Sequence, residues 1–253
     1  LAHFVEHMVF MGSEKYPDEN AWGTFLNERG GSDNGETDSE HTVFYFDVAP
    51  QDLKDALDRF AQFFIEPLFT QSATDREMNA VNSENAKNQQ TDVWRQMQLK
   101  KSLARPDHPF HNFGTGNNAT LRDAPKEAGI DLRARLLAFH AKYYSSNVMR
   151  LCIIGREPLD FLEALAVKYF SDVANQGIAN PAYDPDPYRP QDLGTRLTVV
   201  PVKDARTVEL TWLLPAVQDL GFFDCPHLAR DSFERFLYRC RQTQRQWERS
   251  ARR

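Results

Sequence analysis

A short stretch near the start of the chain predicts a β-hairpin. Residues 31–48 read GSDNGETDSEHTVFYFDV, a pattern that alternates and then ends in β-branched and aromatic residues. Such residues favour strands, whereas the polar residues in the middle favour a turn. We therefore expect two strands joined near residues 38–40. An early hairpin between helical segments favours a mixed sheet over a doubly wound parallel one.

Helical periodicity surrounds the hairpin. Apolar residues recur at helical spacing in residues 2–11, 52–65, 131–144 and 159–170, and a long polar-faced helix is expected over residues 72–103. Buried or alternating strands are expected at residues 149–155, 196–202 and 207–215. Because helices and strands alternate irregularly, the sequence predicts an α+β fold. Its mixed, mostly antiparallel sheet would be covered on one face by helices.

Composition limits the classes of partner. The formal net charge is −6, which gives no general affinity for nucleic acid. No run of residues is long and apolar enough to predict a membrane span. The three cysteines, Cys152, Cys225 and Cys240, have no CxxC spacing, so they predict neither a disulfide framework nor a thiolate zinc site. A reducing, cytoplasmic location fits this pattern, although a targeting segment could precede residue 1.

The first helical segment carries a metal-binding pattern. His3, Glu6 and His7 stand at positions i, i+3 and i+4, so they project from one side of a helix. Two neutral imidazoles at this spacing can bind one Zn²⁺, and the nearby carboxylate can take a proton from a metal-bound water. The alternative is a chance coincidence of these residue types on a helix.

A catalytic zinc requires a third protein ligand. The segment REMNAVNSE offers Glu77 and Glu84, which are seven residues apart and therefore lie nearly in line on one helix face. A solvated acidic face is the alternative interpretation, since most helical glutamates are exposed. The spacing alone does not decide between the two.

Longer motifs carry a resemblance to a known family. The order His-x-x-Glu-His defines the inverzincins. The chain resembles the pitrilysin-like zinc metallopeptidases, in the branch of insulin-degrading enzyme and nardilysin. The matching segments are LAHFVEHMVFMGSEKYPDEN, GGSDN, EHTVFYFDV, DREMNAVNSE, HPFHNFGTGN and KYYSSNVM, and they extend over residues 1–215. This resemblance implies the N-terminal catalytic domain of a zinc metalloendopeptidase that hydrolyses oligopeptides.

The resemblance assigns roles around one zinc ion per chain. It implies that His3, His7 and Glu84 are the ligands and that Glu6 is the general base on zinc-bound water. Glu77 matches a family position that supports the site without ligating, as a carboxylate does when it orients a histidine through its free N–H.

The resemblance implies that peptide substrates bind as an added strand on an exposed sheet edge beside the zinc. It places Asn34, Gly35 and Glu36 on the segment of this chain that receives the peptide, with Asn34 contacting the substrate backbone. A carboxylate at Glu36 would favour a basic side chain near the cleaved bond, unless it is simply an exposed charge. Phe10 and Trp94 match aromatic positions that line the pocket, although core packing is an equal alternative for each.

The resemblance also implies that the chain is part of a larger enzyme. The family places a strand before the motif helix and joins two large halves that enclose the substrate. We therefore expect the C-terminal half of the full-length enzyme as a partner of the domain at residues 1–215, and poor peptide hydrolysis by this chain alone.

Residues 216–253 depart from the family pattern. They are rich in arginine, and we interpret them as a divergent basic segment or a genuine basic helical tail. A non-catalytic scaffold or partner subunit of the same fold is the alternative function for the whole chain. The simultaneous presence of His3, Glu6, His7 and Glu84 disfavours that alternative.

Overall fold

The computed structural model describes residues 1–184, 186–204, 207–211 and 213. The chain divides into two compact units, residues 1–204 and 205–253, and every helix and strand given below lies in the first. The expected domain boundary at residue 215 and the basic segment at 216–253 lie outside the described residues. None of the described helices is long and apolar enough to cross a membrane.

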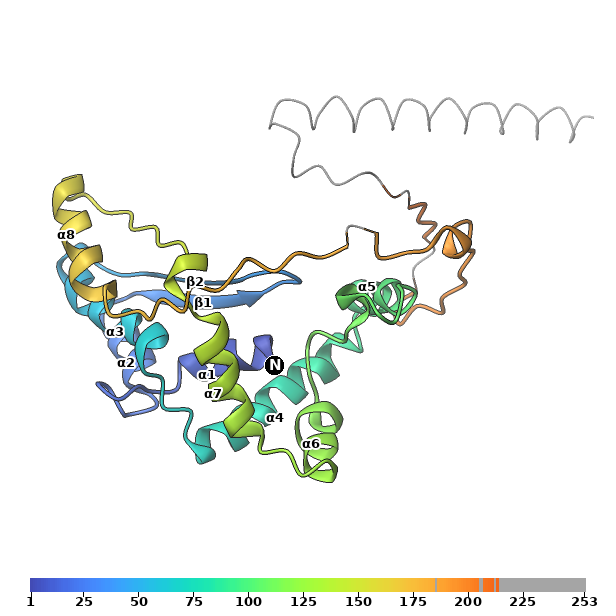
Figure 1. Cartoon of the computed structure of the whole chain (residues 1–253), viewed down its shortest axis with the longest axis horizontal. Helices are drawn as coiled ribbons and strands as arrows, with labels where there is room; N and C mark the ends of the chain where they lie inside the picture. Colours follow the sequence, from blue (N-terminus) through green and yellow to red (C-terminus); the bar gives the residue numbers. More distant parts are fainter. Residues whose placement is uncertain (185, 205–206, 212, 214–253) are drawn as a thin grey trace, which may run out of the picture. The chain divides into compact units, whose positions relative to one another are not determined.

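The first unit combines helices with a small antiparallel sheet (Figure 1). Its helices are α1 (Ala2–Val9), α2 (Ala21–Asn27), α3 (Leu53–Ile65), α4 (Gln71–Asn88), α5 (Asp92–Ser102), α6 (Ala124–Glu127), α7 (Leu132–Tyr143) and α8 (Leu159–Phe170). Its strands are β1 (Ser32–Thr37) and β2 (Thr42–Asp47). Short 3₁₀ turns lie at Pro50–Asp52, Pro109–His111, Ser146–Val148 and Pro190–Asp192, and a π-helical turn lies at Ala119–Asp123.

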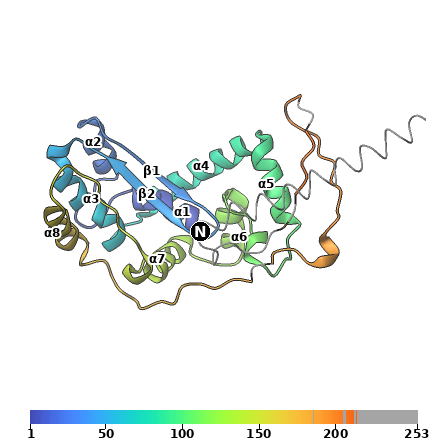
Figure 2. The same ribbon diagram turned by 90° about the horizontal axis from the view of Figure 1, so that it is seen from above.

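Helix α1 contacts several other elements of the first unit. It packs against the hairpin, α4 and α7, which come from distant parts of the sequence (Figures 1 and 2). Its apolar face is almost completely buried through four side chains, Phe4, Val5, Met8 and Val9. Burial of this face on several sides fixes the rotation of the helix, and so fixes where its polar residues point.

The predicted hairpin is confirmed. β1 and β2 pair antiparallel, with Thr37 opposite Thr42, and the amide of Asp38 donates to the carbonyl of His41 across the turn at 2.9 Å. Phe44 and Phe46 on β2 are half-buried, as expected for alternate residues that share one face of a strand. This face turns toward the helices.

Aromatic rings fill the space between the hairpin and helices α2 and α3. The ring centroid of Phe46 lies 5.3 Å from that of Trp22 on α2 and 4.9 Å from that of Phe60 on α3. Phe44 contacts Phe64 on α3 in an edge-to-face arrangement, with centroids 5.7 Å apart. Such pairs add specific geometry to apolar burial, so they fix the hairpin on the helices.

The single long helix expected over residues 72–103 is wrong, because two helices, α4 and α5, occupy this segment. Thr91 has an extended backbone, with φ −122° and ψ 118°, and the chain restarts as a helix at Asp92. A carboxylate in the first turn favours a helix start. Asp92 also accepts hydrogen bonds from the amides of Val202 and Lys203, at 2.8 and 3.2 Å, so a tertiary contact supports the break.

The sheet is smaller than the mixed sheet expected from the sequence. Among the described residues it has two strands, and the segments at 149–155 and 196–202 are not strands. Leu151 and Ile154 are exposed, whereas a central strand would bury them. β-Branched composition alone predicted these strands, but a strand also needs a neighbour that completes its hydrogen bonds.

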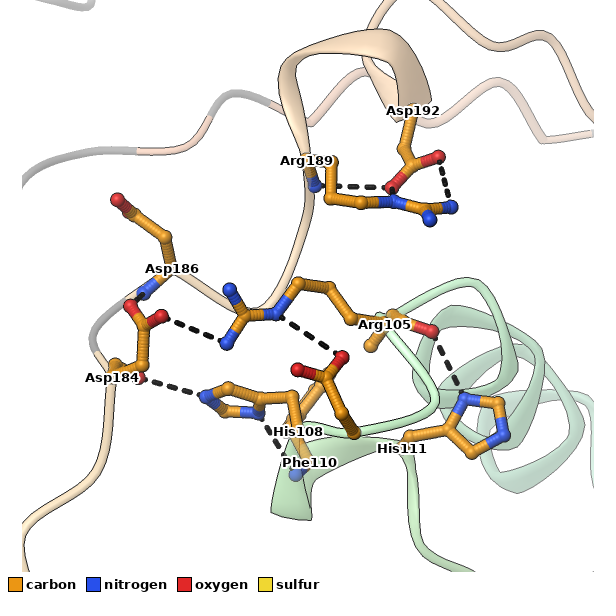
Figure 3. Close-up of polar contacts among 10 residues, drawn as sticks. Arg105, His108, Phe110, His111, Asp184, Asp186, Arg189 and Asp192 are labelled. Carbon is orange, nitrogen blue, oxygen red and sulfur yellow. Dashed lines mark hydrogen bonds and ion pairs between the residues drawn. The ribbon is translucent and has the colours of Figure 1, made fainter.

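A polar network fastens Asp184 to the loop that follows α5 (Figure 3). The guanidinium of Arg105 donates to the carboxylate of Asp184 at 2.8 Å, and Nε2 of His108 donates to the carbonyl of the same residue at 2.7 Å. Nδ1 of His108 accepts from the amide of Phe110 at 3.0 Å, which is consistent with a neutral ring protonated on Nε2. The loop is therefore held at a defined place before it continues toward residue 115.

His140 joins α7 to α3 from inside the core. Its Nε2 donates to the carbonyl of Phe63 at 2.9 Å, and its ring stacks on Tyr144 with centroids 4.4 Å apart. Burial lowers the pKa of His140 from its ordinary value of 6.5, and the hydrogen bond to Phe63 only partly opposes this. The folded chain therefore holds the ring neutral.

This neutral histidine predicts a loss of stability in acid. The unfolded chain protonates His140 near pH 6.5, whereas the folded chain resists protonation until a lower pH. The stabilisation is thus fully present above pH 6.5 and is lost as the pH falls below it. Chemical unfolding of His140→Gln should show a smaller fall in the free energy of unfolding, between about pH 8 and about pH 5, than the parent shows. His41→Gln, which removes an exposed histidine, serves as the control. Equal falls in all three proteins would contradict the assignment.

Candidate metal centre

Helix α1 presents two imidazoles side by side. His3 and His7 are one helical turn apart, and their ring centroids lie 4.8 Å apart in an edge-to-face arrangement. Both are half-buried, with side-chain exposures of 14% and 24%. Because the apolar residues of α1 are buried, the two rings are held on the one face of the helix that looks toward α4.

Helix α4 brings a carboxylate to this pair. Oε2 of Glu84 lies 3.2 Å from Nε2 of His3 and 3.7 Å from Nε2 of His7. The candidate ligand atoms of the three residues all lie within 4.8 Å of one another. Donors at ordinary zinc distances in a tetrahedral arrangement lie about 3.4 Å apart, so this donor set fits a zinc ion.

The remaining ring nitrogens each have a partner of their own. Nδ1 of His3 donates to the carbonyl of Thr115 at 2.6 Å, and Nδ1 of His7 lies 3.2 Å from Oε2 of Glu77. A proton on Nδ1 leaves the lone pair of a neutral ring on Nε2, the atom that faces Glu84. Glu77 thus contacts a histidine and is outside the group of three candidate ligands.

The carboxylates make this place favourable for positive charge. Burial alone would lower the pKa of His7, but the hydrogen bond to Glu77 and the nearby carboxylate of Glu84 outweigh it and raise the pKa to about 9. Burial also opposes protonation of His3, but the carboxylate of Glu84 and the hydrogen bond to the carbonyl of Thr115 outweigh it and raise the pKa of His3. The two histidine rings beside Glu84 hold the pKa of its carboxyl group far below the ordinary value. A divalent cation can replace the two protons at this position.

Glu6 lies beside the cluster and has its own partners on β1. It is buried, at 7% exposed, and its Oε2 accepts a hydrogen bond from the hydroxyl of Thr37. A Cβ atom at Gly35 would lie 2.8 Å from Cγ of Glu6 and 2.9 Å from its Oε1, so a glycine permits this close approach of strand and helix. The carboxylate is therefore oriented, and it is separate from the three candidate ligands.

The residues expected to bind substrate have different surroundings. Asn34 and Glu36 are exposed on β1, and the side chain of Asn34 donates to the hydroxyl of Tyr45 at 3.1 Å. Phe10 packs into the aromatic cluster, with its ring 5.0 Å from that of Phe63. Trp94 is 46% exposed on α5. Of these residues and Gly35, only Gly35 lies against Glu6.

Sequence reasoning missed two groups that contact the cluster, Thr37 and the carbonyl of Thr115. The period of two along a strand offered a signal for Thr37, because it places residue 37 on the same face as residue 35. Thr115 contributes a backbone atom, so its side chain gave no signal. The GTG sequence at residues 114–116 predicted a loop and belongs to the segment HPFHNFGTGN that carries the family resemblance, but neither observation indicated a contact with His3.

Comparisons with known proteins identify similar chains. A family model described as insulinase, peptidase family M16, matches residues 1–107, and a model described as the peptidase M16 inactive domain matches residues 131–229. Insulin-degrading enzyme of Homo sapiens is 50% identical over 208 residues, which are 82% of this chain and 20% of that protein. Nardilysin of Rattus norvegicus is 46% identical over 220 residues, which are 86% of this chain and 19% of that protein.

A solved structure has the same fold. The crystal structure of pitrilysin matches with a TM-score of 0.71 and 36% sequence identity, over 76% of this chain and 20% of that one. The chain spans about a fifth of the length of the curated relatives that it matches. The similarity in sequence and the similarity in fold each cover about three quarters or more of this chain.

The geometry predicts an order of effects on zinc binding. His7→Ala and Glu84→Gln each remove a candidate ligand, so each should abolish or nearly abolish zinc binding by the purified chain. Glu77→Gln alters only a partner of His7 and should weaken binding by roughly 10- to 100-fold. Zinc affinity is measured by competition with a chelator, with the exposed helical residue Glu163→Gln as the control. Full zinc retention by His7→Ala, or equal losses for Glu77→Gln and Glu84→Gln, would show that the roles are misassigned.

Proposed function

The chain belongs to peptidase family M16, the insulinase family, and we propose on this basis that it is the metal-binding part of a zinc-dependent metalloendopeptidase. Its reaction would be the hydrolysis of peptide bonds in oligopeptides. The observation that carries the proposal is the cluster of His3, His7 and Glu84 with the buried carboxylate of Glu6 beside it. A structural zinc site would have no need of that additional, separately oriented carboxylate.

The proposed zinc ligands are His3, His7 and Glu84. Two imidazole nitrogens and one carboxylate oxygen form a donor set that zinc accepts, and three protein ligands leave a position for substrate chemistry. The hydrogen bonds of the two Nδ1 atoms support this assignment, because they direct Nε2 of each ring toward Glu84. When bound, zinc would supply Lewis-acid chemistry, which lowers the pKa of a coordinated water and polarises a carbonyl group.

Glu6 is the proposed general base. It is on the same turn of α1 as His7, and its carboxylate is oriented by the hydroxyl of Thr37. It would accept the proton of the attacking water and then pass that proton to the amine that leaves the cleaved peptide bond. A fixed position supports this role, since proton transfer requires the base to be within hydrogen-bond reach of the water.

β1 is the proposed docking strand for the peptide. In the described structure it has β2 as its strand neighbour on one side, so its other edge can pair with an extended peptide. Gly35 would bring that peptide close to Glu6, while Asn34 and Glu36 would contact its backbone and side chains. The pocket roles of Phe10 and Trp94 remain part of this proposal.

The rest of the enzyme is a further proposed partner. The curated relatives are about five times longer than the region they share with this chain. Positioning of a substrate by enclosing walls can supply several kcal/mol of barrier lowering. We therefore expect this chain alone to hydrolyse peptides slowly.

Replacement of the proposed base separates catalysis from metal binding. Glu6→Gln should bind zinc as tightly as the parent, because Glu6 is not among the candidate ligands. Its rate of peptide hydrolysis should fall by at least about 10²-fold, the lower end of what a positioned base contributes.

The rate is measured with a quenched fluorogenic peptide over long incubations at equal zinc occupancy, with Glu163→Gln as the control. Equal rates for the parent and Glu6→Gln would exclude Glu6 as the base. Zinc binding with no hydrolysis above the Glu6→Gln rate, even at high concentration, would favour a non-catalytic subunit.

A further inference from the structure

In the described structure, the carbonyl of Thr115 is the only backbone group that accepts a hydrogen bond from the ring of either candidate histidine ligand. It accepts from Nδ1 of His3 at 2.6 Å, although 112 residues separate the two in sequence. A loop is a weaker support for a ligand than a helix or strand, because loops are more mobile. The position of this carbonyl therefore needs a cause.

One cause is the conformation of Gly116. Its φ of +94° lies in the region that glycine adopts freely and other residues avoid. A Cβ atom there would lie 2.8 Å from Cδ1 of Leu121 and 3.2 Å from Cγ1 of Val81 on α4. The peptide that carries the Thr115 carbonyl is thus pressed against α4 and the buried side chain of Leu121.

The second cause is a hydrogen bond that fastens the loop to α4. The amide of Asn118 donates to Oδ1 of Asn82 at 3.0 Å, a contact that is partly buried. Asn82 stands two residues before Glu84 on the same helix. The helix that contributes the carboxylate therefore also holds the loop that orients His3.

We propose that Asn82 is a positioning residue of the metal centre. Its side chain anchors the loop at residues 115–118, so that the Thr115 carbonyl fixes His3 with the proton on Nδ1 and the lone pair on Nε2. This inference rests on the proposed zinc function. It adds a residue that touches no candidate ligand and acts on His3 through the backbone.

The anchor has a consequence for affinity. When it is lost, the carbonyl of Thr115 is free to move, and His3 can rotate or exchange its tautomer. Zinc binding must then offset the conformational entropy that is lost when the ring of His3 is ordered again. An outer partner of a ligand typically changes metal affinity by 10- to 100-fold, and we expect about 10-fold for this indirect contact.

The test compares three substitutions on α4. Asn82→Ala removes the acceptor and should weaken Zn²⁺ binding about 10-fold in chelator competition. Asn82→Asp keeps an oxygen acceptor for the Asn118 amide and should retain the parent's affinity. Asn79→Ala, an exposed residue whose side chain bonds only to Asp75 on the same helix, should leave the affinity unchanged. Asparagine is replaced by alanine in both cases, so the gain in helix propensity is matched.

A second readout concerns His3 itself. The Nδ1–H proton of His3 is followed by NMR in the metal-free and zinc-loaded chain, where its hydrogen bond should slow exchange with water. Asn82→Ala should speed that exchange while the melting temperature of the metal-free chain stays close to that of the parent. Gly116→Ala, which displaces the same carbonyl from the loop side, should act in the same direction.

The outcomes are separable. Equal zinc affinity and equal Nδ1–H exchange in Asn82→Ala and the parent would overturn the inference, as would an Asn82→Asp variant as weak as Asn82→Ala. Absence of zinc binding by the parent would overturn the proposed function instead. The Nδ1–H exchange of the metal-free chain would then still decide whether Asn82 positions His3.

Discussion

Burial of the apolar face of α1 is the interaction on which the candidate metal centre depends. A helix of eight residues is unstable by itself in water, since too few hydrogen bonds offset the cost of nucleation. Phe4, Val5, Met8 and Val9 supply the missing free energy by packing against the hairpin, α4 and α7. The two histidines have a defined geometry only because these contacts form the helix. The candidate metal centre is thus a product of tertiary structure, although its first motif is local in sequence.

On the polar side of α1, side chains of opposite charge lie next to one another. Two imidazoles and the carboxylates of Glu77 and Glu84 share a half-buried space, which would be costly for any of them alone. Each lies beside a partner of the opposite charge, and the raised pKa of His7 and the depressed pKa of Glu84 both follow from this group of side chains. Glu6 has a hydrogen-bonding partner of its own, the hydroxyl of Thr37 on β1. One helix therefore presents the candidate ligands and a carboxylate that is oriented separately from them.

Parts of this arrangement could be predicted from sequence because local geometry fixes them. The spacing of His3, Glu6 and His7 determines a shared helix face, and the alternation at residues 31–48 determines a hairpin. The choice between Glu77 and Glu84 could not be made from their spacing, since it depends on how α4 crosses α1, and the resemblance to a family supplied it. The break at Thr91 carried a local signal in the Thr-Asp pair, which the polar periodicity on both sides obscured. The strands expected at 149–155 and 196–202 failed because composition cannot specify a neighbour, and the Thr115 carbonyl was invisible because every residue has one.

The alternation of β1 divides two kinds of constraint between odd and even positions. Gly35 and Thr37 face Glu6, where added bulk or a lost hydroxyl would move the carboxylate. Asn34 and Glu36 are exposed, and the side chain of Asn34 donates to the hydroxyl of Tyr45 on the neighbouring strand. The outward side chains of this strand can therefore vary while the inward side chains keep the carboxylate of Glu6 in place. The two sets of positions on this six-residue strand can therefore change independently of each other.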